Sequence, residues 1–224
     1  MKSKKNKIYY NDYIMRILEL FKGTGSITKY FIDNNDVEVI SLDILEKYNP
    51  TICSDIMTFD YKQFDIGYFD IIFASPECKI FSQLQNTLIG RKWKDKEHLQ
   101  NEREKNKIYI NKTIEIIEYL KPTYYFIENP LYSKIWDYID NKNYINKHVI
   151  VDYCYFGYDY KKPTKILTNK ILENKRCLCK KHNMRLGITT NKMSNGLTDN
   201  MIKDNTTLNQ RYSIPQKLLD YLFN

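Results

Sequence analysis

Short apolar segments alternate with amphipathic ones along most of this chain, and this alternation limits the possible folds more than any other feature. The apolar segments are rich in β-branched and aromatic residues and are typical of strands; they lie at residues 14–20, 37–42, 69–74, 123–128, 148–156 and 164–169. Helical spacing occurs at residues 26–32 and 107–120, and again after Pro215. Strands that alternate with helices pair in parallel through crossover connections. The sequence therefore predicts an α/β protein with a doubly wound, mostly parallel sheet.

Length and spacing also predict the domain organisation. A chain of 224 residues with 42% hydrophobic residues is expected to form one α/β domain with a packed core. We expect a basic N-terminal extension at 1–13, a catalytic domain at 14–173, a loop-rich insert at 174–207 and a C-terminal helix at 208–224 that returns to the catalytic domain. Residues 86–107 are polar and weakly periodic, which predicts a mobile loop.

Composition narrows the choice of partners and compartment. The net charge of +8 and the 20 tyrosines favour a polyanionic partner, most simply nucleic acid, although compositional drift in an AT-rich gene would give the same bias. No apolar run approaches the ~20 residues of a membrane helix, and the N-terminus lacks the apolar stretch of a signal peptide. Five irregularly spaced cysteines favour reduced thiols. The expectation is a cytoplasmic protein without a membrane segment.

A glycine-containing turn follows the first predicted strand. Glycine allows a tight turn and a close approach of the backbone to a ligand. An acidic residue, Asp43, ends the next strand about 20 residues later, where a carboxylate can bind the hydroxyls of a ribose. The turn consists of Phe21, Lys22, Gly23, Thr24 and Gly25. Together, the turn and Asp43 favour a site for a nucleoside-containing cofactor over a tight turn without a ligand.

A cysteine follows another predicted strand, at residues 69–74. Cys78 lies just past the carboxyl end of this strand, where open α/β sheets bind ligands, and Pro76 would stiffen its loop. A single cysteine is more often a small buried hydrophobic residue. The polar neighbours Glu77 and Lys79 argue against that interpretation.

Two further polar groups occur near strand ends. Glu128 either caps a following helix or acts as a general acid in the crevice that holds Cys78. Lys161, Lys162 and Lys165 precede or begin the last strand, where they form either a solvated charge run or a site for phosphate or carboxylate.

Taken in order, these segments resemble the DNA cytosine-5 methyltransferases, particularly their short phage- and virus-type members. LFKGTG, VISLD and SDIM resemble the cofactor motifs of that family, SPEC its Pro-x-Cys nucleophile loop, IEN its Glu-Asn motif and GYDYKKPTKI its basic motif. RYSIPQKLLDYL is similar to its terminal helix. The resemblance extends from Ile14 to Leu222.

The resemblance implies the Rossmann-like fold of methyltransferases that use S-adenosylmethionine, and a monomer that methylates cytosine C5 in duplex DNA. It implies no metal. The catalytic residues would be Cys78 as nucleophile, Glu128 as the carboxylate, and Lys162 and Lys165 as the basic pair. The implied cofactor-binding residues are Phe21, Lys22, Gly23, Thr24, Gly25, Asp43, Ile44, Asp55, Ile56 and Pro76.

The chain departs from the family pattern at three places. Glu77 stands where a second proline is common, and its charge disfavours a thiolate unless Lys79 or another cation offsets it. Lys162 and Lys165 replace arginines at a spacing one residue wider than usual, and lysine lacks the planar fork of arginine. The target-recognition segment is reduced to the short insert.

Several alternatives stay open. Transfer RNA is a second candidate substrate, because the same fold is used on it. An inactive nucleic-acid-binding module is a third. An amino-methyltransferase would use Asn129-Pro130-Leu131-Tyr132, although in that family the loop follows the fourth strand. Cys177, Cys179 and His182 are three candidate zinc ligands without an evident fourth.

Overall fold

The computed structural model describes residues 13–139, 144, 147–178 and 212–224. Seven strands form one sheet in the order β3-β2-β1-β4-β5-β7-β6. All neighbouring strands pair in parallel except β7, which is antiparallel to both β5 and β6. The strands are β1 (Met15–Leu20), β2 (Val37–Asp43), β3 (Ile52–Cys53), β4 (Ile71–Ala74), β5 (Tyr124–Pro130), β6 (His148–Asp152) and β7 (Pro163–Thr168).

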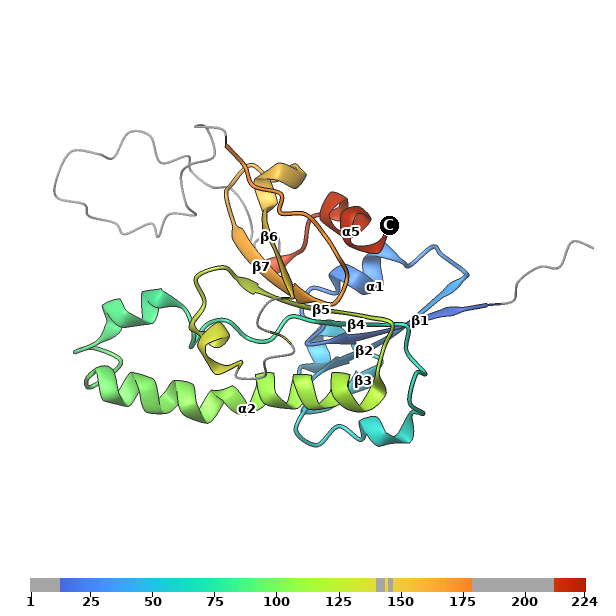
Figure 1. Cartoon of the computed structure of the whole chain (residues 1–224). Coiled ribbons are helices and arrows are strands. Elements are labelled where there is room, and N and C mark those ends of the chain that lie inside the picture. Colours follow the sequence, from blue (N-terminus) through green and yellow to red (C-terminus); the bar gives the residue numbers. More distant parts are fainter. Residues whose placement is uncertain (1–12, 140–143, 145–146, 179–211) are drawn as a thin grey trace, which may run out of the picture.

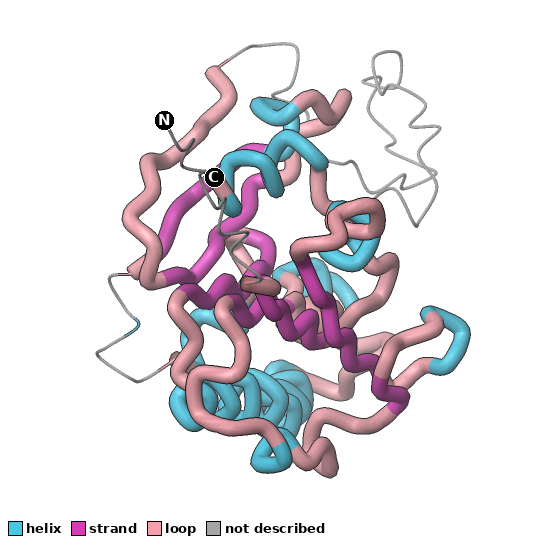
Figure 2. The backbone as a smooth tube through the Cα atoms, turned by 90° about the vertical axis from the view of Figure 1, so that its right-hand side faces the viewer, coloured by secondary structure: helices cyan, strands magenta, loops and turns pink. Residues whose placement is uncertain are grey.

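Helices cover both faces of the sheet (Figure 1). The long helix α2 (Lys96–Leu120) runs along one face, while α1 (Ser26–Tyr30) and α5 (Gln216–Phe223) lie together on the other. The tube view shows the sheet twisting between these two layers (Figure 2). The short 3-10 helices are η1 (Glu46–Tyr48), η2 (Tyr61–Gln63), η3 (Gln83–Leu88), η4 (Lys134–Tyr138) and η5 (Tyr153–Phe156).

Each face of the sheet has its own hydrophobic core. Leu18, Ile72 and Ile127 pack on the α2 side, and Ile17, Phe73 and Phe126 pack on the side of α1 and α5. Successive residues of a strand point to opposite faces, so a strand buried on both sides is apolar throughout. This explains the continuous apolar runs in the sequence and confirms the predicted doubly wound sheet.

The strand order reverses between β1 and β4, because the chain proceeds outwards from β1 through β2 to β3 and then returns to β4. In sheets of this type, ligands bind outside the carboxyl ends of the strands at such a switch point. The loops after β1 and β4 both leave the sheet there, and they contain the glycine turn and Cys78 respectively.

Residues 86–107 do not form the mobile loop that the sequence suggests. Helix α2 begins at Lys96, eleven residues before the predicted start, and extends for 25 residues. The Asp95 carboxylate accepts a hydrogen bond from the His98 amide (2.8 Å) and caps the helix. Leu99 and Arg103 are buried one turn apart. This part of the helix was not predicted because its composition is polar and because a charged residue, Arg103, takes a buried position where an apolar residue is expected.

Other boundaries shift by smaller amounts. Strand β5 continues to Pro130, so Glu128 and Asn129 lie within it, and β6 ends at Asp152 instead of continuing to residue 156. The two-residue strand β3 was not expected, since two residues are too few for a periodic signal. Within the described residues, the structure contains no helix with the length and apolar character needed to cross a bilayer.

Candidate active site

The loop between β1 and α1 turns through several left-handed residues. Gly23 (φ 48°) and Gly25 (φ 68°) adopt this conformation without strain, and Phe21 (φ 58°) adopts it despite its bulk. The Gly23 amide donates to the Asp43 carboxylate (2.8 Å), which ties the turn to the end of β2. The Lys22 side chain passes over Gly25, where an added Cβ would lie 3.1 Å from its Cε, and its ammonium donates to the Asn49 carbonyl (2.6 Å).

A cavity opens between this loop and the ends of β2 and β4. Six of the predicted cofactor residues line it, namely Phe21, Asp43, Ile44, Asp55, Ile56 and Pro76. Lys22, Gly23, Thr24 and Gly25 do not line this cavity but form the adjoining turn. Sequence reasoning missed the part of the lining that comes from α2 and its neighbours, which includes Asn106, Tyr109 and Ile135. Those residues become neighbours of the cavity only because α2 crosses the sheet beside it.

The chemistry of the cavity fits a nucleoside. Asp43 and Asp55 each present a carboxylate, while Ile44 and Ile56 supply apolar surface beside them. Each Asp43 oxygen already accepts one backbone amide, from Gly23 and from Leu45 (both 2.8 Å). A carboxylate oxygen accepts more than one hydrogen bond, so the orientation of Asp43 is held while acceptor sites stay open for hydroxyl groups.

Cys78 lies in the loop after β4 as a free, partly exposed thiol. Burial raises the pKa of this thiol, and the negative charges of Glu128 and Glu77 raise it further. Lys162 acts in the opposite direction and lowers the pKa of Cys78. The sequence left open whether Lys79 or another cation offsets these charges, and the cation that does so is Lys162.

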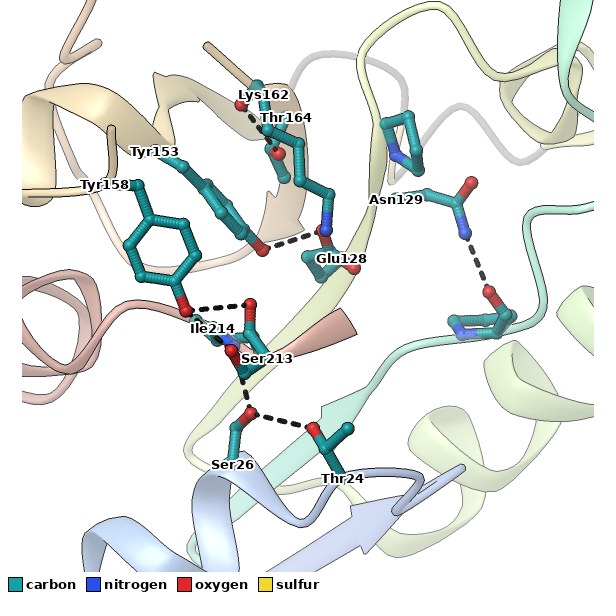
Figure 3. A network of polar contacts seen from close by, with 12 residues as sticks. Thr24, Ser26, Glu128, Asn129, Tyr153, Tyr158, Lys162, Thr164, Ser213 and Ile214 are labelled. Carbon is teal, nitrogen blue, oxygen red and sulfur yellow. Dashed lines mark hydrogen bonds and ion pairs between the residues drawn. The ribbon is translucent and has the colours of Figure 1, made fainter. Parts of the chain in front are cut away.

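Glu128 is a buried carboxylate on β5 with two polar neighbours (Figure 3). The Tyr153 hydroxyl donates to its Oε1 (2.9 Å), and the Lys162 ammonium lies 3.5 Å from the same oxygen. Burial and the neighbouring carboxylate raise the pKa of Tyr153 well above its usual value, so this hydroxyl stays protonated and keeps donating. Among the residues with described positions, both contacts involve Oε1, so Oε2 stays available for another partner.

Asn129 connects β5 to the loop that contains Cys78. Its amide nitrogen donates to the Pro76 carbonyl (2.8 Å), and the side chain is buried (Figure 3). The rival amino-methyltransferase motif begins at this residue, but Asn129 and Pro130 lie inside β5 and not in a loop after β4. The structure therefore uses Asn129 to hold the Cys78 loop, which disfavours the rival interpretation.

The predicted basic pair is divided by the sheet. Lys165 pairs with Asn129 across β5 and β7, and its ammonium lies 5.0 Å from the centre of the Trp136 ring on the α2 side. Glu128 faces the opposite side, as do Thr164 and Ile166 of β7. Lys162 and Lys165, which the resemblance predicts as one basic pair, thus lie on opposite faces of the sheet, because side chains alternate along a strand with a period of two.

Three contributors to this region were missed by sequence reasoning. Tyr153 lies just after β6 and is fully buried, and Thr164 is fully buried on β7. Arg103 of α2 donates to the carbonyls of Ile80 and Ser82 (both 3.2 Å), which follow Cys78 in the chain. Tyr153 and Thr164 are recognisable only after the antiparallel pairing of the last strands is known.

The zinc hypothesis lies mostly beyond what the structure covers. Cys179 and His182 are outside the described residues, as are nearly all of the N-terminal extension and most of the insert. Among the residues with described positions, no group of three or more histidine, cysteine or acidic side chains is arranged to hold a metal ion.

Comparison with known proteins identifies the family. No family model matches the chain. The "Probable DNA (cytosine-5)-methyltransferase" of frog virus 3 (isolate Goorha) is 33% identical over 159 residues, which are 69% of this chain and 71% of the viral protein.

Two solved structures of methyltransferases are also similar. The Entamoeba histolytica methyltransferase EhMeth has a TM-score of 0.50 at 17% identity, over 72% of this chain and 57% of that one. The S. pombe Dnmt2 methyltransferase has a TM-score of 0.47 at 18% identity, over 71% and 53%. The matched region thus spans little more than half of each of these structures. The first likeness shows the methyltransferase fold, and the viral sequence shows that the chain belongs to the DNA (cytosine-5)-methyltransferase family.

Proposed function

We propose that this protein transfers a methyl group from S-adenosylmethionine to C5 of a cytosine in DNA, through a covalent adduct with Cys78. The observation that carries the proposal is the arrangement around Glu128. The Lys162 ammonium lies 3.5 Å from its Oε1, and the amide of the next residue, Asn129, donates to the Pro76 carbonyl (2.8 Å) and so ties the Cys78 loop to the same strand. A nucleophile, a carboxylate and a cation are thus grouped beside a cavity whose acidic and apolar lining suits a nucleoside.

In the proposed reaction, the Cys78 thiolate adds to C6 of the cytosine ring. This addition moves electron density toward N3 and makes C5 nucleophilic. Glu128 offers Oε2 to N3, where a shared proton prevents negative charge from accumulating. Tyr153 and Lys162 hold the carboxylate in orientation through Oε1.

The later steps restore the thiol. S-adenosylmethionine, bound beside Asp43 and Asp55, would supply the methyl group that C5 accepts. A base then removes the C5 proton, and elimination releases Cys78 and regenerates the aromatic ring. The target base must first leave the helical stack at a cost of a few kcal/mol, and phosphate contacts from a basic protein offset that cost.

The experiment compares wild-type protein with Cys78→Ala and Glu128→Gln, on duplex DNA and on transfer RNA in parallel. We expect 5-methylcytosine in DNA from the wild type, none from Cys78→Ala, and a loss of about a hundredfold or more from Glu128→Gln. DNA that contains 5-fluorocytosine should trap a covalent adduct with the wild type only. Lys105→Met, on the exposed side of α2, serves as the matched surface control.

Each other outcome selects a different interpretation. If 5-methylcytosine appears only in transfer RNA, the substrate is transfer RNA and the proposed reaction at Cys78 still holds. Methylation at an amino group would contradict the role of Cys78. Absence of both cofactor binding and adduct formation would leave a nucleic-acid-binding module.

A further inference from the structure

Asp152, at the end of β6, is a fully buried carboxylate in a cluster of donors. Its Oδ2 accepts hydrogen bonds from the Arg176 Nε (3.0 Å) and the Cys177 amide (2.8 Å), and the Lys161 ammonium lies 3.7 Å away. A buried charge is strongly unfavourable unless it is paired and hydrogen-bonded. The two cations and the amide supply such partners to this carboxylate.

These donors come from both sides of β6. Lys161 precedes β7, the neighbouring strand in the sheet. Arg176 and Cys177 follow a parallel bridge between Val151 and Lys175 that covers the outer edge of β6. The Asp152 carboxylate thus joins three chain segments at the edge of the sheet.

Both residues that contact Glu128 are immediate neighbours of this cluster. Tyr153 follows Asp152, and Lys162 follows Lys161 in the chain. The Tyr153 amide also donates to the Lys162 carbonyl (3.2 Å), so the two backbones are joined directly. Beyond this link, the Tyr153 hydroxyl and the Lys162 ammonium meet at Glu128 Oε1 (Figure 3).

We propose that Asp152 is a positioning residue for the catalytic carboxylate and acts through Tyr153 and Lys162. Its charge holds the segments of Lys161 and Arg176 against the end of β6. That attachment sets where the Tyr153 hydroxyl and the Lys162 ammonium meet Glu128. The role of Asp152 in catalysis rests on the proposed function of Glu128. The structural coupling of Asp152 to Glu128 does not depend on that function.

The variant Asp152→Asn removes the charge with almost no change in shape. An amide oxygen can replace Oδ2, and the amide nitrogen can take the place of Oδ1, which has no hydrogen-bond partner among the described residues. Arg176→Gln, at a side chain 37% exposed, removes one donor as a second and milder variant. Glu173→Gln is the control, because Glu173 lies nearby, pairs with Lys175 and has a side chain 85% exposed.

Kinetics separate positioning from a general loss of stability. We expect Asp152→Asn to lower kcat by about tenfold, since small displacements of a catalytic group are costly, and to leave the KM for S-adenosylmethionine unchanged. In the Tyr153→Phe background, Asp152→Asn should lower kcat by a much smaller factor than it does in the wild type, because the two residues act through one contact. If Asp152→Asn lowers kcat by the same factor in the wild type and in Tyr153→Phe, the proposal is overturned.

A spectroscopic measurement does not depend on activity. In protein labelled with ¹³C at the glutamate carboxyl groups, Glu128→Gln assigns the Glu128 resonance. Asp152→Asn and Arg176→Gln should shift this resonance and Glu173→Gln should not. An unmoved resonance would overturn the proposal even if activity fell. A shifted resonance in a wild-type protein that proves inactive would keep the coupling and refute the proposed function alone.

Discussion

At the scale of single residues, the ionisation of Cys78 depends on its burial and on three side-chain charges. Burial raises the pKa of the thiol most, Glu128 and Glu77 raise it further, and Lys162 lowers it. Only the thiolate is nucleophilic, so these charges set the pH range in which Cys78 reacts. The family position that usually contains proline contains a glutamate here, and this makes the Cys78 thiol harder to ionise.

Two variants with opposite effects test this balance. Glu77→Gln removes a negative charge and should lower the pKa of Cys78, so that the thiol reacts at lower pH. Lys162→Met removes the cation and should raise the pKa, so that reaction needs higher pH. The measurement is the rate of iodoacetamide alkylation at Cys78, followed by peptide mass spectrometry across a pH series. Lys79→Met is the control, and a larger effect from it than from Lys162→Met would contradict the assignment.

At the scale of elements, helix α2 supports the segment that follows Cys78. Arg103 is 6% exposed and donates through its guanidinium to two backbone carbonyls of that segment, those of Ile80 and Ser82. A guanidinium provides several donors in a fixed plane, which suits this paired contact better than an ammonium does. The charged residue at a core position therefore has a structural reason.

Replacing this guanidinium should lower the stability of the protein and loosen the attachment of the loop that contains Cys78. Arg103→Met removes the side-chain donor to the Ile80 carbonyl, whereas the Ser82 carbonyl keeps the Gln85 amide (3.1 Å). We expect a loss of about 1–3 kcal/mol in the free energy of unfolding, measured in urea. Adduct formation with 5-fluorocytosine DNA should slow as well. Lys105→Met is the control on the same helix, because the Lys105 side chain is 71% exposed. Equal stability of the two variants would show that Arg103 contributes nothing to this attachment.

At the scale of the whole molecule, the net charge of +8 predicts how the protein meets its substrate. Lysine and arginine contacts to phosphate release counterions, so affinity for nucleic acid falls steeply as salt rises. The acidic cavity that would hold the cofactor does not share this dependence.

Salt should therefore separate the two kinds of binding. We expect the affinity for a non-specific DNA duplex to fall roughly tenfold or more between about 50 and 200 mM salt. Thermal stabilisation by S-adenosylhomocysteine should change little over the same range. Fluorescence anisotropy and a thermal shift assay measure the two effects, and a duplex affinity that does not respond to salt would show that the basic composition is compositional drift.

Local pattern was sufficient for the elements with a strong periodic signal. The runs at 14–20, 37–42 and 69–74 became β1, β2 and β4, because their β-branched and apolar residues favour strands. The last of them is buried at all four of its strand positions. The first half of α2 was missed because Arg103 interrupts its apolar stripe. Cys78 was expected just past a strand end and lies there, since parallel strands end at a common edge.

By itself, the sequence determined the type of sheet, the glycine turn with Asp43, and the positions of Cys78 and Glu128 along the chain. These features depend on backbone geometry and strand periodicity, which are local. Only the tertiary structure decided which charges meet. Lys162 reaches Glu128 while Lys165 faces away, and Tyr153 reaches Glu128 from just beyond the end of β6, because antiparallel pairing with β7 sets the register. A shift of one residue in that register exchanges the two faces of a strand, and no local pattern in the sequence specifies it.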